Sequence, residues 1–344
     1  MLRNVILISA VVVTLGQSGA VAQSGEVEKG GRLVRTQLDA RISPAIDLHF
    51  FVRALSVEDR PVSVEGMLPA IEAARTLNEK LGEHLLRWGP IEGALVKCQT
   101  VSEVVAAFEK LPETFGPRQR TPGKAIKLRE SAVRYANALQ NVEPYFVSSI
   151  WPEHNERLAA LRQRLLDGLG QKQATSFEFM MKHLNMTDPA ITIPVYLVFD
   201  APFPGAFTQR GWDGKAVCFV GSQNVEGSQL YETVLHEATH ALDVATAADN
   251  VFATLRDKLT AAGLSRRDHG FRDVPHTLMF VHTAETVRRI LDPEHKDYGD
   301  THGYYKRAPK STDAVRQHWV DYLDGKITQD EALDRIVRDF VNNR

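Results

Sequence analysis

Residues 235–241 read LHEATHA, and this stretch organises the rest of the chain. The run around it has helical spacing, and residues four apart on an α-helix lie one turn above each other on the same face. His236 and His240 therefore offer two imidazoles to one metal ion, with the carboxylate of Glu237 beside them. Imidazole is a common zinc ligand, so the stretch predicts a zinc site that needs a further ligand.

The composition is that of an ordinary globular protein, with 43% hydrophobic residues, 24% charged residues and a net charge of −2 over 344 residues. A chain of this length can bury a sizeable core. The near-neutral balance argues against a nucleic-acid-binding protein, which normally carries a concentrated basic face. We therefore expect no nucleic-acid partner.

The first residues have the features of a secretory signal. A short positive start precedes an apolar run at residues 5–15, and residues 20–22 (AVA) supply the small-x-small pattern of a signal-peptidase site. The run is short for a permanent transmembrane helix, although a short membrane anchor is the alternative. We expect residues 1–22 to be a signal peptide cut after Ala22. The mature protein is then periplasmic or secreted, without a membrane partner.

The chain has two cysteines, Cys98 and Cys218, far apart in sequence. In an oxidising compartment they can form one disulfide that joins the two halves of the chain. The alternative is two separate buried thiols, and the sequence does not decide between them.

The chain divides into a helical part and a mixed part. Residues 23 to about 40 are polar, which is typical of a flexible lead-in, and apolar residues then recur at helical spacing up to residue 186. We expect a helical N-terminal region at residues 23–186. It would support or cover a catalytic region at residues 187–344.

The pattern changes from helical to β at Ile191. Residues 191–199 (ITIPVYLVF) are rich in β-branched and aromatic residues and predict a strand, and residues 215–220 (KAVCFV) predict a second. Prolines and glycines between them predict a break and a turn. The histidine helix follows at about 229–247. The fold class is therefore α+β and mostly α, with C-terminal helices after this helix.

The order of two strands, a loop and a His-Glu-x-x-His helix resembles the upper half of the zincin fold, over about residues 190–290. The resemblance implies a metallopeptidase with one zinc ion, in which Glu237 is the general base toward a zinc-activated water. It also implies an extended peptide or protein substrate bound at the sheet edge, with residues 215–222 as the candidate edge strand. The residues after His240 lack the glycine and histidine of the metzincin extension.

A third ligand must come from further along the chain, where residues 273–289 predict a helix opened by Pro275. His276 lies on its mostly apolar side, where a polar group needs a partner. A helix N-terminus also disfavours the imidazolium form. Glu285 is the alternative, as in gluzincins, but two arginines three and four residues later indicate an exposed, ion-paired face. The two candidates lie about 13 Å apart along a helix, so only one binds the ion.

Two further positions are candidates for supporting roles. Asp243 lies on the face of the two histidines, where it either orients an imidazole or is simply exposed. In the polar loop at residues 292–307, Tyr305 is the candidate for stabilising a developing oxyanion, with His302 as the other choice.

These patterns together predict an exported zinc-dependent hydrolase of the metallopeptidase type. The predicted zinc ligands are His236, His240 and His276, with Glu285 as the alternative to His276. The alternative is a zinc-stabilised binding or structural protein of the cell envelope, in which the motif does not support catalysis.

Overall fold

The structure is a computed structural model that describes residues 34–57, 65–81, 88–115, 126–202, 205–211, 214–246 and 250–343. The expected signal peptide at residues 1–22 lies outside the described residues. None of the described helices combines the length and the apolar composition that crossing a bilayer requires.

The described chain is mostly helical with one small mixed sheet, which confirms the α+β, mostly α, fold class. The sheet contains β1 (Gln37–Arg41), β4 (Thr192–Val198), β5 (Ala206–Arg210) and β6 (Ala216–Gly221). The remaining short strands are β2 (Thr114–Phe115) and β3 (Ile126–Lys127). The helices up to β4 are α1 (Pro44–Val57), α2 (Leu68–Leu81), α3 (Gly89–Ala94), α4 (Val101–Glu109), α5 (Arg129–Ser149), α6 (Trp151–Leu169) and α7 (Gln173–His183). The helices after β6 are α8 (Gln229–Ala245), α9 (Val251–Ala261), α10 (His269–Thr286), α11 (Tyr298–Thr301), α12 (Tyr304–Arg307), α13 (Pro309–Leu323) and α14 (Gln329–Asn342). Short 3₁₀ segments are η1 (Glu65–Met67), η3 (Leu95–Lys97) and η4 (Ser222–Asn224), and α10 continues into the π-helical turn η5 (Val287–Leu291).

The strand order in the sheet is β1-β4-β6-β5, with the first three strands parallel and β5 antiparallel to β6. Successive side chains of a strand point to opposite faces. In β4, Val195 faces one hydrophobic core and Tyr196 the other, and in β6 Cys218 and Phe219 divide in the same way. Both central strands are therefore buried on both faces. This explains why they are apolar almost throughout.

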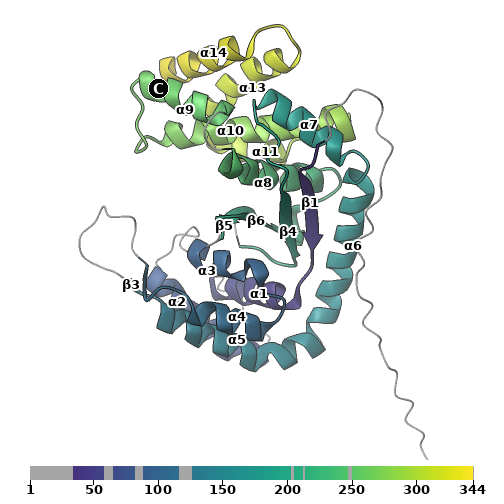
Figure 1. Cartoon of the computed structure of the whole chain (residues 1–344), viewed down its shortest axis with the longest axis vertical. Coiled ribbons are helices and arrows are strands. Elements are labelled where there is room, and N and C mark those ends of the chain that lie inside the picture. The colour runs from purple at the N-terminus through teal and green to yellow at the C-terminus, as the bar shows by residue number, and fades with distance from the viewer. Residues whose placement is uncertain are drawn as a thin grey trace, which may run out of the picture. The chain divides into compact units, whose positions relative to one another are not determined.

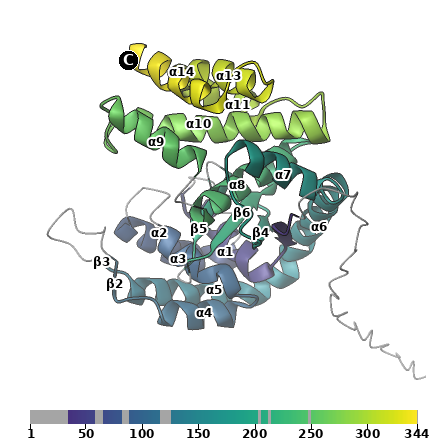
Figure 2. The same ribbon diagram turned by 45° about the horizontal axis from the view of Figure 1, so that its top comes forward.

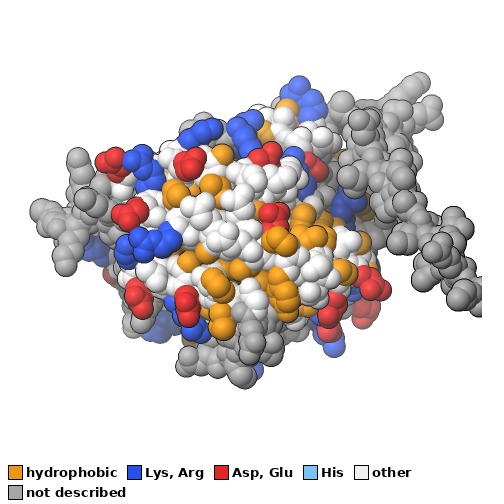
Figure 3. All heavy atoms as spheres, turned by 90° about the horizontal axis from the view of Figure 1, so that it is seen from below, with side chains coloured by type: hydrophobic (Ala, Val, Ile, Leu, Met, Phe, Trp, Pro, Cys, Tyr) orange, Lys and Arg blue, Asp and Glu red, His pale blue; other side chains and the backbone are white. Residues whose placement is uncertain are grey.

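Helices cover both faces of the sheet, as Figures 1 and 2 show. Helices α1 to α5 pack on one face, and α7 to α14 lie on the other, while α6 runs alongside the sheet (Figure 1). Figure 3 views the α1–α5 side from outside, where acidic and basic side chains are interspersed with small apolar areas. Scattered apolar side chains of this kind are normal on protein surfaces.

The described residues from Val34 onward form one compact unit. Helices α6 and α7, which precede the expected boundary between residues 186 and 187, contribute to the same core as α8 and α10. Cys98 and Cys218 are both buried free thiols and belong to the two different cores. The alternative of separate thiols therefore holds in this structure.

Both edges of the sheet differ from the prediction made from the sequence. The supposed flexible lead-in contains β1, which pairs in parallel with β4, more than 150 residues later. The break expected after the first predicted strand contains β5. Because β5 pairs with β6, the strand at residues 216–221 is internal, and residues 215–222 do not form the sheet edge. The edge strand on that side is β5.

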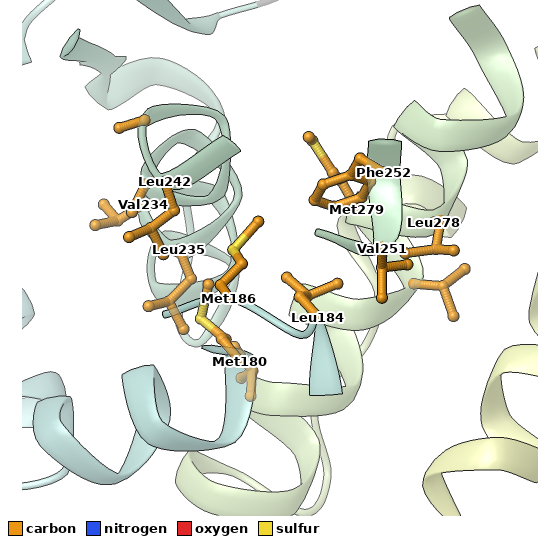
Figure 4. Close-up of a cluster of buried hydrophobic side chains, with 14 of the residues drawn as sticks. Met180, Leu184, Met186, Val234, Leu235, Leu242, Val251, Phe252, Leu278 and Met279 are labelled. Atoms are coloured by element: carbon orange, nitrogen blue, oxygen red, sulfur yellow. The ribbon is translucent and has the colours of Figure 1, made fainter. Parts of the chain in front are cut away.

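A hydrophobic cluster between α7, α8, α9 and α10 fixes the helices that carry the candidate site (Figure 4). Leu235 and Leu242 of α8, Phe252 of α9 and Leu278 of α10 are completely buried in it. Burying a side chain of this size contributes about 1.5–3 kcal/mol. The cluster therefore holds α8 and α10 at a fixed distance.

Candidate metal centre

Helix α8 brings His236 and His240 together, as their spacing predicts. Their ring centroids lie 4.9 Å apart. His236 is buried, with 4% of its surface exposed, and His240 is half-buried. Besides the helices of the hydrophobic cluster, α8 contacts strands β5 and β6 of the sheet.

Helix α10 adds His276 to this pair. The Nε2 atoms of His236 and His276 lie 3.2 Å apart, and the ligand atoms of all three histidines lie within 4.8 Å of one another. Two nitrogens bound tetrahedrally to zinc at 2.0–2.1 Å are about 3.3 Å apart. The spacing therefore fits two ligands of one zinc ion. The three histidines are the one group with metal-ligand geometry among the described residues.

A chain of hydrogen bonds fixes the orientation of His276. Thr277 Oγ1 donates to the carbonyl of Asp273 (2.7 Å), so it accepts from the Tyr304 hydroxyl (3.3 Å). Tyr304 in turn accepts from His276 Nδ1 (3.3 Å). His276 therefore carries its proton on Nδ1 and presents the Nε2 lone pair to the other histidines. Metal-binding histidines commonly donate their second N–H in this way.

The environment keeps all three imidazoles neutral. Burial lowers the pKa of His240 to about 4 and that of His276 to about 3, and it lowers the pKa of His236 well below its usual value. Proximity to one another lowers the pKa of His236 and His276 further. His276 does not lie at a helix N-terminus as predicted, because α10 begins at His269 and Pro275 lies inside it. A neutral imidazole can bind a metal at neutral pH.

Glu237 is buried beside the histidines, with 5% of its surface exposed. Thr208 on β5 donates to its Oε2 atom (2.7 Å) and also lies 2.9 Å from its backbone oxygen. Burial raises the pKa of Glu237 to about 8, although the hydrogen bond from Thr208 opposes this rise. A carboxylate with a raised pKa is suited to accepting and returning a proton near neutral pH.

Aromatic side chains line one side of the histidine group. The ring of Phe280 stacks on His236 at a centroid distance of 4.0 Å, and Tyr304 lies 4.3 Å from Phe280. The ring of Tyr298 also stacks on Phe280, at a centroid distance of 6.2 Å. Burial raises the pKa of Tyr298, and the nearby carboxylates of Glu232 and Glu237 raise it further.

The structure places the alternative ligand Glu285 away from the histidine group. Its carboxylate is held by Arg288 and by Arg289 (2.8 Å). The ion pairing matches the sequence pattern, but the face is not exposed, because Glu285 has only 8% of its surface exposed. This carboxylate connects α10 to the residues that follow it.

Asp243 does not contact the histidine rings. It accepts hydrogen bonds from Asn250 (2.9 Å) and Arg256 (2.8 Å), which join α8 to the start of α9 and to its middle. Its negative charge still raises the pKa of His240, against the larger effect of burial. Asp243 is therefore an ion-paired residue near the histidine group.

The structure brings Tyr304, and not Tyr305, to the histidine group. Tyr305 packs against Gly299 and under the guanidinium of Arg316, which lies 4.8 Å from its ring. His302 stacks on Tyr298 at 3.9 Å and makes no described contact with the three histidines.

Sequence reasoning missed Tyr304, Thr208 and Phe280. Gly303 has a φ of +69°, a conformation that favours glycine, and it immediately precedes Tyr304. The Gly-Tyr-Tyr stretch was therefore the signal in the sequence that could have identified Tyr304. The sequence contains no comparable signal for Thr208, because its role depends on β5.

Comparison of the chain with family models, with curated proteins and with solved structures gives no significant match.

Proposed function

We propose that the chain is a zinc-dependent hydrolase of the metallopeptidase type. The observation that carries this proposal is the convergence of three neutral histidines from α8 and α10, with Glu237 next to one of them. Three protein ligands and one open position are characteristic of catalytic zinc sites, whereas structural zinc sites use four protein ligands. The three-histidine set therefore favours a catalytic site over a purely structural one.

The zinc ligands in this proposal are His236, His240 and His276. When bound, the ion would supply Lewis-acid chemistry and increase the acidity of a water molecule. Glu237 would accept a proton from the attacking water and return it to the leaving nitrogen. Thr208 would hold one oxygen of this carboxylate and leave the other for the proton.

The proposed substrate is a peptide or protein bound in extended form. The outer edge of β5 pairs with no other strand among the described residues, and β5 carries the residue that contacts Glu237. An exposed edge can add a substrate strand through main-chain hydrogen bonds. The strand proposed for this role is therefore β5.

We also propose that the protein is exported, on the basis of the signal features of residues 1–22. Expression of the full chain in a bacterial host tests this part separately. N-terminal sequencing of exported protein is expected to begin at Gln23. Retention of the whole chain in the cytoplasm would contradict it.

The test of catalysis is Glu237→Gln, which keeps the size of the side chain and removes the base. Wild-type protein loaded with zinc is expected to cleave members of a broad peptide library. The variant should bind zinc equally and lose at least about 100-fold in rate, the lower part of the usual range for general-base catalysis. Equal hydrolysis by both proteins would refute the role of Glu237. Zinc binding without hydrolysis by the wild type would favour a zinc-stabilised binding or structural protein.

A further inference from the structure

Three buried side-chain polar atoms on α8 have no hydrogen-bond partner among the described residues, and two of them belong to residues one helical turn apart. These two are Oε1 of Glu232, a residue with 0% of its surface exposed, and Nδ1 of His236, a residue with 4% exposed. Leaving a buried polar atom unpaired is energetically unfavourable. Two such atoms one helical turn apart, next to a candidate metal site, call for a common explanation.

The two atoms are chemically complementary once His236 binds a metal through Nε2. Its Nδ1 atom then carries the proton and needs an acceptor, and Oε1 of Glu232 is an acceptor. Residues four apart on a helix have Cβ atoms about 5–6 Å apart. Helical side chains also lean toward the N-terminus, so we expect the ring of His236 over the turn that carries Glu232.

The rest of the Glu232 carboxylate is already held in place. Its Oε2 atom accepts from the backbone N–H of Tyr298 (2.7 Å) and from Nε2 of His295 (2.7 Å). Nδ1 of His295 in turn forms a hydrogen bond with the hydroxyl of Ser228 (2.8 Å). These bonds occupy one oxygen and leave Oε1 as the remaining acceptor of the carboxylate.

We propose that Glu232 is the positioning residue for His236: its Oε1 atom accepts the Nδ1 proton and fixes the ring with Nε2 toward the metal. This inference rests on the proposed metal site. A carboxylate in this position orients a ligand imidazole and increases its basicity, and removal of such a partner typically lowers metal affinity by about 10–100-fold. The sequence candidate for this role, Asp243, is bound to Arg256 and Asn250 instead.

Thr233 provides a matched control. Its Oγ1 atom is also buried without a partner, and it lies three residues before His236 on the same helix. A neutral hydroxyl is a weaker acceptor than a carboxylate for the N–H of a metal-bound imidazole. Substitution of Thr233 should therefore have much less effect than substitution of Glu232.

The experiment measures zinc affinity by competition with a chromophoric chelator, in the full chain without substrate. Glu232→Leu is expected to weaken zinc binding by about 10–100-fold. Glu232→Gln should retain most of the affinity because its amide oxygen still accepts, and Thr233→Val should bind like the wild type. Wild-type affinity in Glu232→Leu, or an equal loss in Thr233→Val, would overturn the proposal.

If Glu232→Leu does not fold, a second measurement tests whether Glu232 accepts the Nδ1 proton of His236. Proton NMR of the zinc-loaded protein detects the Nδ1 proton of His236, which should resonate further upfield in Glu232→Gln because an amide accepts more weakly than a carboxylate. An unchanged resonance would overturn the proposal. If the wild type binds no zinc, the proposed function fails. If zinc binding is normal but insensitive to Glu232, only this inference fails.

Discussion

Thr208 Oγ1 lies 2.7 Å from Oε2 of Glu237, which ties the edge strand β5 to the helix of the candidate metal centre. The one hydrogen bond described for this carboxylate is to Oε2 and not to the other oxygen, Oε1. One oxygen is therefore held while the other stays available, which is the arrangement that a positioned general base requires.

The first prediction concerns this contact. A hydrogen bond to a charged group contributes about 1.5–3 kcal/mol, so Thr208→Val should lower kcat by about 10–100-fold. KM and zinc content should stay unchanged. The hydroxyl of Thr208 contacts none of the proposed zinc ligands, and the unpaired edge of β5 consists of main-chain groups, which the substitution leaves in place. Thr208→Ser retains the hydroxyl and should keep most of the activity. A wild-type kcat in Thr208→Val would contradict this role.

The second prediction separates a structural carboxylate from a ligand. Glu285→Gln should retain the full zinc content, because Glu285 is held by Arg288 and Arg289. It should lower the free energy of unfolding by about 1–3 kcal/mol, since two partly buried guanidinium groups lose a charged partner. Urea denaturation measures this, with the exposed Glu294→Gln as the control. Loss of zinc in Glu285→Gln would instead identify Glu285 as the ligand.

The third prediction compares two adjacent tyrosines. Tyr304→Phe leaves the Nδ1 proton of His276 without its acceptor and should weaken zinc binding by about 10-fold. The buried hydroxyl of Tyr305 has no partner among the described residues, so Tyr305→Phe should leave zinc affinity unchanged and stability equal or slightly higher. Chelator competition and thermal unfolding measure both effects. Weaker zinc binding in Tyr305→Phe alone would reverse the assignment.

The fourth prediction concerns the pH dependence of stability without metal. Burial lowers the pKa of His276 to about 3, that of His240 to about 4 and that of His282 to about 3. In the unfolded chain these groups titrate near 6.5, so below that pH the unfolded state binds more protons. Stability should therefore fall as the pH decreases from 6.5 toward 4.

Urea denaturation of the metal-free protein at several pH values measures this slope. His282→Gln tests whether buried neutral histidines cause this slope. His282 lies outside the candidate site, and its removal should make the free energy of unfolding depend less on pH. A stability that is constant between pH 7 and pH 4 would show that these histidines are not held in the neutral form.

Local patterns in the sequence predicted the central elements of the fold. Strands β4 and β6 are apolar almost throughout because both faces are buried, and α8 shows its helical spacing directly. His276 was found because a polar side chain on an apolar helix face needs a partner. Each of these signals is contained within a single element.

The missed features depend on contacts between distant segments. In β1 only Ala40 is buried, and the strand forms because β4 supplies its hydrogen bonds across more than 150 residues. No residue of β5 is buried, so its sequence shows no strand alternation. The choice between Tyr304 and Tyr305 depends on how a short loop turns after Gly303. Sequence spacing contains no information on that direction.

The most direct test of the metal centre is the zinc content of purified protein, measured for the wild type, His276→Ala and Glu285→Ala. Zinc X-ray absorption of the wild type would identify the ligand atoms. The wild type and Glu285→Ala are expected to hold one zinc per chain with nitrogen and oxygen ligands, and His276→Ala should lose the metal. A wild type without zinc, or a His276→Ala protein that retains it, would contradict the three-histidine site.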